Sequence, residues 1–506
     1  MHKNSDALNW IERKDLSNQI FNIYKFGFLD NDFEKEKFSQ SFSNHVLNRI
    51  GVLYSLSNYV LIEEDYVENE WKVMVANHYI NSAYADKLRT HVIRIHFLSD
   101  KVFSSQNYLG FITLRPIEEI EISLSFIYMN WEYRFFSTPT YVMTYNKDIN
   151  FKGKKITIKT YPFFSQDSIV TCCADVNIIM VGRYLSNKYG FSNVMLSDLV
   201  KKSNKFLRRM PRVVSINDVQ DLLSSISIPY LVYRIESDNE LIEYIIDAYI
   251  ESAIPVIMFI GDHVVQIIGH MDNSDESEMQ YIIYDDSGYL EKKLSLSPTN
   301  KKTFYYNTTI KRIKEYLQSM STSQKKARGF LIVPMFDKVY VDIVNYLKHL
   351  RFHISRLTNY SNGENLLKSF VFPNFGGETD SIDSVNAENE SLNKISIRNM
   401  LVDNSQLKTH IKNKVLPSLI STFIEDKPDG EFVDSLFDSS NITNLLNSPL
   451  SHYNWYTEFR HGDECICLCA DTTMFYATSN DQKLFLHFEP TYVDADKTLL
   501  LLTKSN

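Results

Sequence analysis

The sequence predicts an α+β protein, and three patterns carry that prediction. The first fifty or so residues, beginning with IERKDLSNQIFNIYKFGF and continuing through FSQSFSNHVLNRIGVLYSLSNYV, have apolar side chains at helical spacing. Runs rich in β-branched and aromatic residues follow and predict strands at 91–99, 108–117, 123–136 and 154–164. From about residue 165 the helical period returns and then gives way to apolar strands, which predicts helices followed by an antiparallel sheet.

The central region has the clearest order of elements. Residues 173–190 predict a helix that ends at Gly190, because apolar side chains recur at helical spacing at Val176, Ile179, Met180 and Tyr184. Three further helices are expected to begin at Ser197–Asp198, at Ser215–Asp218, and at Asp238 or Asn239. Apolar strands are then predicted at 255–260, 263–271 and 279–286.

The remaining residues suggest how the chain is divided. Residues 374–395 are acidic, polar and poor in aromatic side chains, which is typical of a linker or mobile loop. Beyond them, 464–479 and 483–493 predict a β-hairpin. We therefore expect an N-terminal α+β module (1–150), a central domain (151–340) and a C-terminal α+β region (341–506).

Composition excludes several classes of protein. The 506 residues are 44 % hydrophobic and 13 % aromatic, which is enough for packed cores and excludes wholesale disorder. The net charge of −9 argues against a nucleic-acid binder. Five cysteines in so long a chain fit a reducing compartment. The amino terminus lacks a signal peptide and no stretch can span a bilayer, so we expect a cytoplasmic protein without membrane contact.

Cys173 is the candidate nucleophile. It stands at the predicted start of the 173–190 helix, where the positive end of the helix dipole favours a thiolate. The thiolate is the reactive form of cysteine, so this position suits covalent catalysis. Asp175 in the same first turn also suits the helix end, but it would oppose a thiolate nearby.

Three further residues complete a candidate site. His263 begins a predicted strand after Gly-Asp, so it is expected at the mouth of the sheet, where it can act as the base. Asp285, at the end of the next strand, is placed to orient that imidazole if the two strands are hairpin neighbours. Gln166, in a loop before the nucleophile, and the backbone N–H of Cys173 can donate to a developing oxyanion.

These residues resemble the papain-like cysteine peptidases, and most closely peptidase family C39 and its C39-like relatives. The run FFSQDSIVTCCADVNIIMVGRYL is similar to the family's Gln…Cys helix, with Met180 and Tyr184 in the register that selects Cys173 over Cys172. PVIMFIGDHVVQIIGHMD and YIIYDDSG resemble the family's His and Asp strands, except that Asp286 stands where proline usually follows the aspartate. The likeness covers about residues 155–335, and YLGFITLRP before it resembles a strand that precedes such domains in bacterial proteins.

The resemblance implies a cysteine peptidase or isopeptidase that acts on a protein or peptide and needs no cofactor or metal. The flanking regions can supply contacts to a protein partner. Two other functions stay open: a silent papain-like scaffold that serves as a binding or assembly module, and a transglutaminase-like acyltransferase with the same triad. We find no P-loop, dinucleotide fingerprint, HExxH motif or EF-hand loop.

The same residues can also have purely structural roles. Cys173 and Cys172 can be small buried hydrophobes, and His263 can be a core histidine. Asp285 and Asp286 can simply begin a turn, and the choice between them is open. Cys465, Cys467 and Cys469 alternate along one predicted strand, which indicates a buried strand face rather than a metal cluster. The basic run at 201–212 indicates a solvated helix face.

Overall fold

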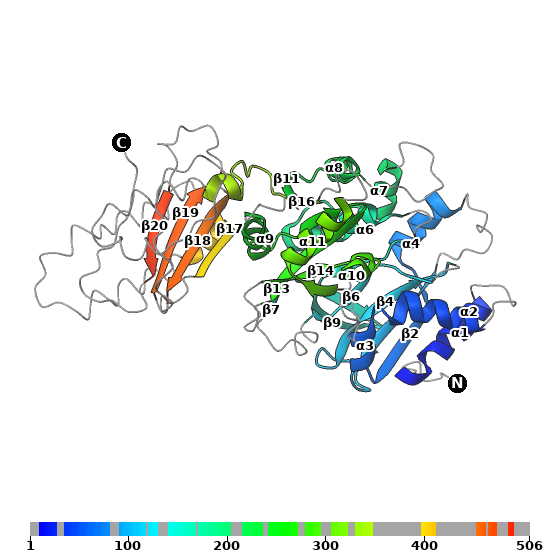
Figure 1. Cartoon of the computed structure of the whole chain (residues 1–506). Coiled ribbons are helices and arrows are strands. Elements are labelled where there is room, and N and C mark those ends of the chain that lie inside the picture. The colour runs from blue at the N-terminus through cyan, green and yellow to red at the C-terminus, as the bar shows by residue number, and fades with distance from the viewer. Residues whose placement is uncertain are drawn as a thin grey trace, which may run out of the picture. The chain divides into compact units, whose positions relative to one another are not determined.

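The computed structural model divides the chain into two compact units. Unit 1 is Met1–Ser237 with Pro255–Pro334, and unit 2 is Asp238–Ile254 with Met335–Asn506. The structure describes residues 10–27, 35–80, 91–117, 120–129, 140–167, 171–203, 215–235, 241–271, 279–294, 305–321, 329–347, 396–410, 452–461, 464–472 and 484–489. Helices and antiparallel sheets within these ranges confirm the predicted α+β class (Figure 1).

The first sheet of unit 1 contains most of the strands predicted in the N-terminal third. It is antiparallel, with the order β1-β2-β3-β4-β6-β10 and β5 paired with β4. Its strands are β1 (Ile11–Glu12), β2 (Tyr59–Tyr66), β3 (Val92–Leu98), β4 (Tyr108–Arg115), β5 (Glu121–Ile122), β6 (Ser125–Ile127) and β10 (Pro162–Phe163). The side chains of β3 and β4 are buried along both strands, so other parts of the chain cover both faces of this sheet.

Short helices connect the first strands of this sheet. They are the 3₁₀ turn Arg13–Asp15, α1 (Leu16–Gly27), α2 (Lys35–Phe42), the π turn Ser43–Leu47, α3 (Gly51–Leu56), α4 (Asn69–Met74) and the π turn Val75–Tyr79. The helical segment predicted to continue through Val60 ends earlier. Tyr59 and Val60 belong to β2, because pairing with β3 satisfies the backbone of this apolar, β-branched run better than one more helical turn.

The second sheet of unit 1 carries the predicted His and Asp strands. Its order is β11-β16-β12-β13-β14-β15, with β7 paired to the far end of β13, and every pairing is antiparallel. The strands are β7 (Thr140–Val142), β11 (Tyr230–Ile235), β12 (Val256–Ile260), β13 (His263–Met271), β14 (Gln280–Tyr284), β15 (Tyr305–Thr308) and β16 (Gly329–Pro334). The predicted strands at 255–260, 263–271 and 279–286 are confirmed as β12, β13 and β14.

Helix α6 (Cys173–Tyr189) lies against β13, and it is buried over most of its length. It ends at Gly190 with a φ of 76°, so the predicted C-terminal glycine is confirmed. Nearby are α7 (Leu196–Ser203) and α8 (Ile216–Ser225), while α10 (Tyr289–Lys293) and α11 (Ile310–Ser321) follow β14 and β15. Ser215 and Asp218 form the capping box that begins α8, as predicted.

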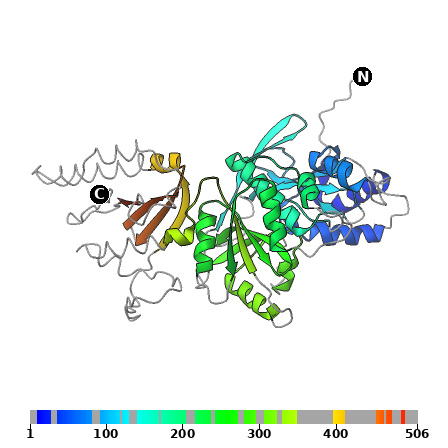
Figure 2. The same ribbon diagram turned by 90° about the horizontal axis from the view of Figure 1, so that it is seen from above.

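The segment between α4 and α6 joins both sheets of unit 1. Strand β7 pairs with the second sheet and β10 pairs with the first, while β8 (Tyr145–Phe151) and β9 (Lys154–Thr160) form a separate hairpin between them. This hairpin is the pair of cyan strands that projects from unit 1 in Figure 2. The boundary predicted near residue 150 falls inside it, and the division into three domains stays a prediction.

Unit 2 contains a four-stranded antiparallel sheet and the helices around it. Strands β17 (Ser396–Asp403), β18 (Tyr453–His461), β19 (Glu464–Asp471) and β20 (Leu484–Glu489) pair in that order, and α9 (Leu241–Glu251) packs on β17; α14 (Asn404–His410) follows β17. The buried Trp455 ring lies between those of Tyr249 and Tyr346, and its Nε1–H donates to the Val341 carbonyl at 2.7 Å.

Several sequence predictions concern residues of unit 2. The predicted hairpin is confirmed by the pairing of β19 with β20. The three alternating cysteines lie on β19, but their side chains are outside the described part of the structure. The acidic segment 374–395 lies outside the described residues as well. Among the helices that the structure describes, none combines the length and apolar character needed to cross a membrane.

Gly269 marks a close approach between β13 and β7. A Cβ built at this residue meets the Tyr141 carbonyl oxygen and lies 3.0 Å from the Val142 Cα. We expect Gly269→Ala to lower the free energy of unfolding by about 1–3 kcal/mol, because the backbone of β7 must move away. Gly182→Ala in α6 is the control, since its Cβ meets only Ile226 Cδ1 at 4.0 Å.

Urea denaturation of both variants tests this expectation. The control should gain up to about 1 kcal/mol, because alanine loses less conformational entropy than glycine when it enters a helix. If Gly269→Ala unfolds at the same urea concentration as the wild type, the close pairing of β7 with β13 is wrong.

Candidate active site

The two adjacent cysteines have different roles at the start of α6. Cys172 is the N-cap residue, and both its backbone N–H and its thiol donate to the Asp175 carboxylate at 3.1 Å. Asp175 therefore contacts Cys172, the thiol next to the candidate nucleophile. Burial, and then the negative charge of Asp175, raise the pKa of the Cys172 thiol far above its usual value. Cys172 is thus held as an unreactive thiol.

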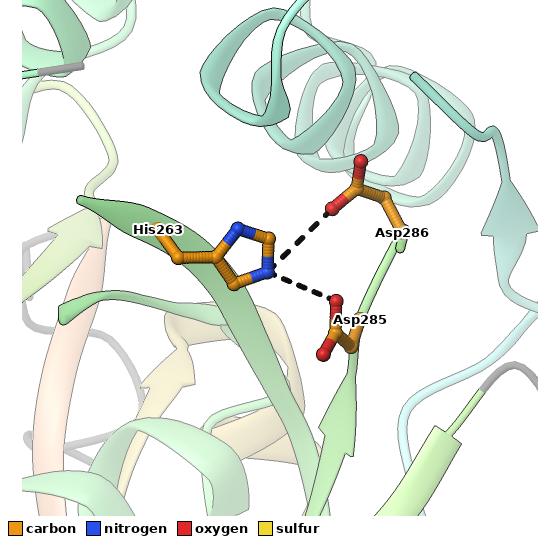
Figure 3. Close-up of side chains that lie close together, drawn as sticks. All are labelled: His263, Asp285 and Asp286. Atoms are coloured by element: carbon orange, nitrogen blue, oxygen red, sulfur yellow. Dashed lines mark hydrogen bonds and ion pairs between the residues drawn. The ribbon is translucent and has the colours of Figure 1, made fainter. Parts of the chain in front are cut away.

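Cys173, the first residue of α6, lies beside the His263 ring. Burial lowers the pKa of His263, but the Asp285 carboxylate and the Cys173 thiol more than reverse this and raise it well above its usual value. The Nε2 atom of His263 is 3.0 Å from Asp285 Oδ1, so Nδ1 is the nitrogen left for the sulfur. Figure 3 shows Nε2 pointing toward the aspartates. An imidazole held in this way can take a proton from the thiol.

Asp285 is held in place by backbone groups of the turn that follows β14. Its Oδ1 accepts a hydrogen bond from the Ser287 N–H at 3.1 Å, and its Oδ2 accepts one from the Leu290 N–H at 3.0 Å. Burial raises the pKa of Asp285, but the His263 charge and hydrogen bond outweigh it and lower the pKa below its usual value. Asp285 therefore stays ionised and fixes the ring of His263.

Asp286 differs from Asp285 although the two are adjacent. Its Oδ1 lies 3.9 Å from His263 Nε2, which is beyond hydrogen-bond distance. No described side chain makes a hydrogen bond to either of its oxygens, and the residue is fully buried. Burial raises the pKa of Asp286 to about 7. The geometry thus makes Asp285 the direct partner of His263, a choice that the sequence left open.

Gln166 lies in the loop that leads from β10 to α6. It is half-buried, and its backbone amide is close enough to Asp286 to lower the pKa of that carboxyl, against the larger effect of burial. The loop thus passes beside the His–Asp pair. The orientation of the Gln166 carboxamide toward an oxyanion stays a prediction.

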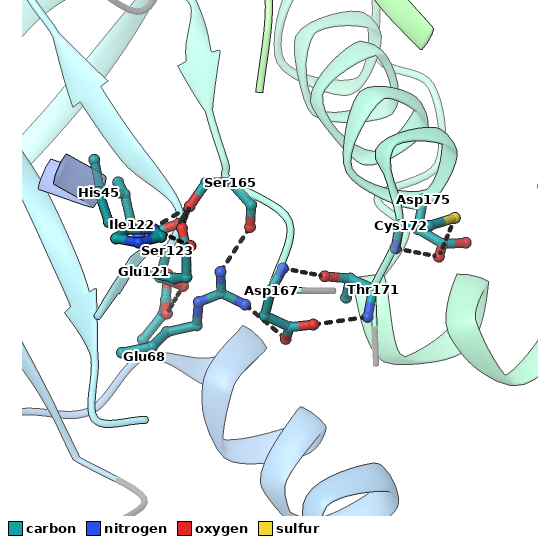
Figure 4. A network of polar contacts seen from close by, with 11 residues as sticks. His45, Glu68, Glu121, Ile122, Ser123, Ser165, Asp167, Thr171, Cys172 and Asp175 are labelled. Carbon is teal, nitrogen blue, oxygen red and sulfur yellow. Dashed lines mark hydrogen bonds and ion pairs between the residues drawn. The ribbon is translucent and has the colours of Figure 1, made fainter. Parts of the chain in front are cut away.

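Buried polar contacts anchor this loop to the first sheet (Figure 4). Arg115 on β4 donates to the Asp167 carboxylate at 3.1 Å and to the Ser165 carbonyl at 2.6 Å. Asp167 accepts from the Thr171 N–H at 3.0 Å, and its own N–H donates to the Thr171 hydroxyl at 3.1 Å. An unpaired charge here would cost several kcal/mol, so Ser165, Asp167 and Thr171 are held firmly in place near the start of α6.

A second buried network fixes α6 against β13. The Asn177 side-chain amide donates to the carbonyls of Cys173 and Val264, both at 2.8 Å. Gln266 on β13 donates to the Asn177 side-chain oxygen at 2.9 Å and to its carbonyl at 3.0 Å. The Tyr161 hydroxyl donates to Gln266 Oε1 at 2.5 Å. These bonds set the position of the nucleophile relative to the strand that begins with His263.

This second network was not predicted from the sequence. Asn177 and Gln266 interrupt otherwise apolar runs, NIIMV in the helix and VVQII in the strand. A polar residue inside a buried run needs a partner, so the pair could have been found by asking what satisfies each amide. Arg115 and Asp167 do not stand out in this way as polar residues inside an apolar run, so the sequence did not indicate that they form an ion pair.

Comparison with known proteins leaves the family of this chain open. No protein-family model matches it, and a search of curated proteins finds no similar sequence. The resemblance to papain-like peptidases therefore stays a prediction, and the site must be judged on its own geometry.

Gln266→Leu tests the network between α6 and β13. The change keeps the side-chain volume but leaves the Asn177 oxygen and the Tyr161 hydroxyl without their partner. We expect a loss of about 1–3 kcal/mol in the free energy of unfolding. Tyr161→Phe removes only one donor and should cost less. Urea denaturation measures both, and a neutral Gln266→Leu variant would show that these bonds do not hold the helix.

Asp286→Asn tests whether the lone buried carboxyl destabilises the protein. Its pKa rises from 3.8 to about 7 on folding, so the wild type loses stability as the pH rises through this window. The asparagine side chain does not ionise, so the variant does not lose this stability as the pH rises. We expect the variant to be more stable than the wild type at about pH 8, by roughly 4 kcal/mol.

The measurement is urea denaturation at several pH values. The control is Asp262→Asn, an exposed carboxylate next to His263, which should behave like the wild type. Equal stability of Asp286→Asn and the wild type throughout the window would show that Asp286 is not desolvated.

Proposed function

We propose that this protein is a thiol-dependent acyl hydrolase, a cysteine peptidase or isopeptidase with a papain-like catalytic centre. One observation carries the proposal: the residue that begins α6 is a cysteine close enough to His263 for its thiol to raise the pKa of that imidazole, and Nε2 of the ring is held by the buried Asp285 carboxylate. Nucleophile, base and orienting group are thus present in the order that acyl transfer needs.

The first half of the reaction forms a thioester. His263 Nδ1 takes the proton of the Cys173 thiol, and the sulfur attacks the acyl carbon while the carbonyl electron pair moves to oxygen. The imidazolium then gives its proton to the leaving amine as the carbon–nitrogen bond breaks. Asp285 keeps its charge throughout and stabilises the imidazolium through its 3.0 Å contact with Nε2.

The second half restores the enzyme. His263 takes a proton from water, and the hydroxyl adds to the thioester carbon. The carbon–sulfur bond then breaks as the imidazolium returns its proton to the sulfur, which releases a carboxylic acid and restores the Cys173 thiol. The Cys173 N–H at the start of α6 and the Gln166 carboxamide are the proposed donors to the oxyanion in both halves. All groups come from the chain, so the scheme uses no cofactor. The proposed substrate is a protein or peptide in the cytoplasm.

One observation favours a second candidate function. Cys173 and His263 are only 5 % and 6 % exposed, so the described residues leave little of the centre open to a substrate. A scaffold with a closed centre would serve as a binding or assembly module and would keep the same buried polar contacts. Thiol reactivity separates the two functions, because a closed centre reacts slowly.

The test is alkylation by iodoacetamide near neutral pH, with the labelled cysteine located by mass spectrometry. We expect Cys173 to label fastest of the five cysteines. His263→Ala should slow its labelling by roughly 10²-fold, because the base that removes the thiol proton is lost. Asp285→Asn should also slow it, by leaving the ring without its orienting partner.

Cys172→Ser is the matched control. Serine is a good N-cap residue, so α6 should keep its capping contact with Asp175 and the Cys173 rate should stay within about twofold of the wild type. Slow labelling of all five cysteines in the wild type would instead support the binding module. If a primary amine is incorporated into an acyl substrate in place of water, the protein is an acyltransferase.

A further inference from the structure

Asp286 has no role in the reaction proposed above. Its side chain is fully buried and makes no hydrogen bond with a described side chain; the backbone N–H of Gln166 is the hydrogen-bond donor that affects its pKa. Figure 3 shows it aimed at His263 from the same side as Asp285. A buried carboxyl that no side chain hydrogen-bonds costs free energy, and native proteins keep few of them without a reason. Its orientation therefore calls for a ligand.

We propose that His263, Asp285 and Asp286 bind a zinc ion that holds the thiol centre inactive. One ligand atom from each residue lies within 4.8 Å of the other two. The distances from His263 Nε2 are 3.0 Å to Asp285 Oδ1 and 3.9 Å to Asp286 Oδ1. Two ligands of a tetrahedral zinc ion at about 2.0–2.1 Å are separated by about 3.3–3.5 Å. The two observed distances bracket that separation.

The charges and ligand types also fit a zinc ion. Two carboxylates and a neutral imidazole carry two negative charges, which balance the dication and relieve the desolvation of Asp286. Nitrogen and oxygen are ordinary zinc ligands, and three protein ligands leave a fourth position for water. Arg49 lies close enough for its positive charge to lower the pKa of both aspartates. That charge also opposes a cation, so we expect reversible binding rather than a permanent structural metal.

Bound zinc would stop the proton transfer on which the proposed function depends. The ion takes the lone pair of His263 Nε2, which places the ring proton on Nδ1. An Nδ1 that carries a proton cannot accept another from Cys173 while the ring stays neutral. This consequence rests on the proposed function, whereas the metal site itself does not.

The first experiment measures binding alone. Zinc is titrated into the full-length, chelator-treated protein by calorimetry, and the wild type is compared with three variants. Asp286→Asn should bind one zinc ion fewer, because an amide is a poorer ligand than a carboxylate. Cys173→Ala should keep the full number, since the sulfur is not one of the three proposed ligands and is assigned to the other ring nitrogen, Nδ1. Asp262→Asn, an exposed neighbour, should match the wild type.

Two results would overturn the metal site. Either Asp286→Asn binds as many zinc ions as the wild type, or Cys173→Ala loses the ion that Asp286→Asn loses. If Asp286→Asn does not fold, cobalt absorption of the wild type and His263→Gln replaces the comparison. The difference spectrum should then show tetrahedral cobalt without a thiolate charge-transfer band, and the presence of that band, or no difference at all, would contradict the site.

The second experiment measures the effect on the thiol. Saturating zinc should slow the alkylation of Cys173 at least tenfold in the wild type and leave the rate in Asp286→Asn within twofold. Unchanged alkylation in the zinc-loaded wild type would overturn the inhibitory role. If zinc binds as expected but Cys173 labels slowly even without metal, the metal site stands and the hydrolase proposal fails.

Discussion

One side-chain amide sets the geometry on which the candidate site depends. Asn177 donates to the carbonyl of Cys173, one turn earlier in α6, and to the carbonyl of Val264, the residue after His263. Gln266 and Tyr161 complete this network, so every hydrogen-bonding group of the two amides is used. An amide buried in an apolar layer tolerates little displacement, because each lost bond leaves a desolvated group. The nucleophile and base, far apart in sequence, are thereby held in register.

The buried carboxylates around this network differ in how well each one is paired. The His263–Asp285 pair is stabilised by backbone hydrogen bonds to the carboxylate, and Arg115 and Asp167 neutralise each other in the loop before α6. Asp286 is the exception, since burial raises the pKa of its carboxyl and no described side chain donates a hydrogen bond to it. A residue that lowers stability without a structural partner is often retained for a function, and a reversible metal ion would be one.

The spacing of apolar residues along the sequence predicted the helices and strands that bury one continuous face. Helix α6 with its Gly190 end, strands β12 to β14 and the β19–β20 hairpin were predicted because their apolar residues recur at a fixed spacing. Periodicity cannot show which strands pair across the chain, and so the joining of β7 to β13 and β10 to β6 was not foreseen. In the site, the nearness of Cys173, His263 and Asp285 followed from their places at the ends of elements. The Asn177–Gln266 pair and the burial of Asp286 depend on tertiary packing, which the local sequence pattern does not predict.

The most direct test of the central claim is the titration of His263 by NMR, with ¹³C-labelled histidine and the resonance assigned by His263→Gln. The thiol of Cys173 and the carboxylate of Asp285 both raise the pKa of this ring. We therefore expect the pKa of His263 to be well above its usual value in the wild type and lower in Cys173→Ala. An identical titration in both proteins would mean that sulfur and imidazole do not interact, and would contradict the proposed centre.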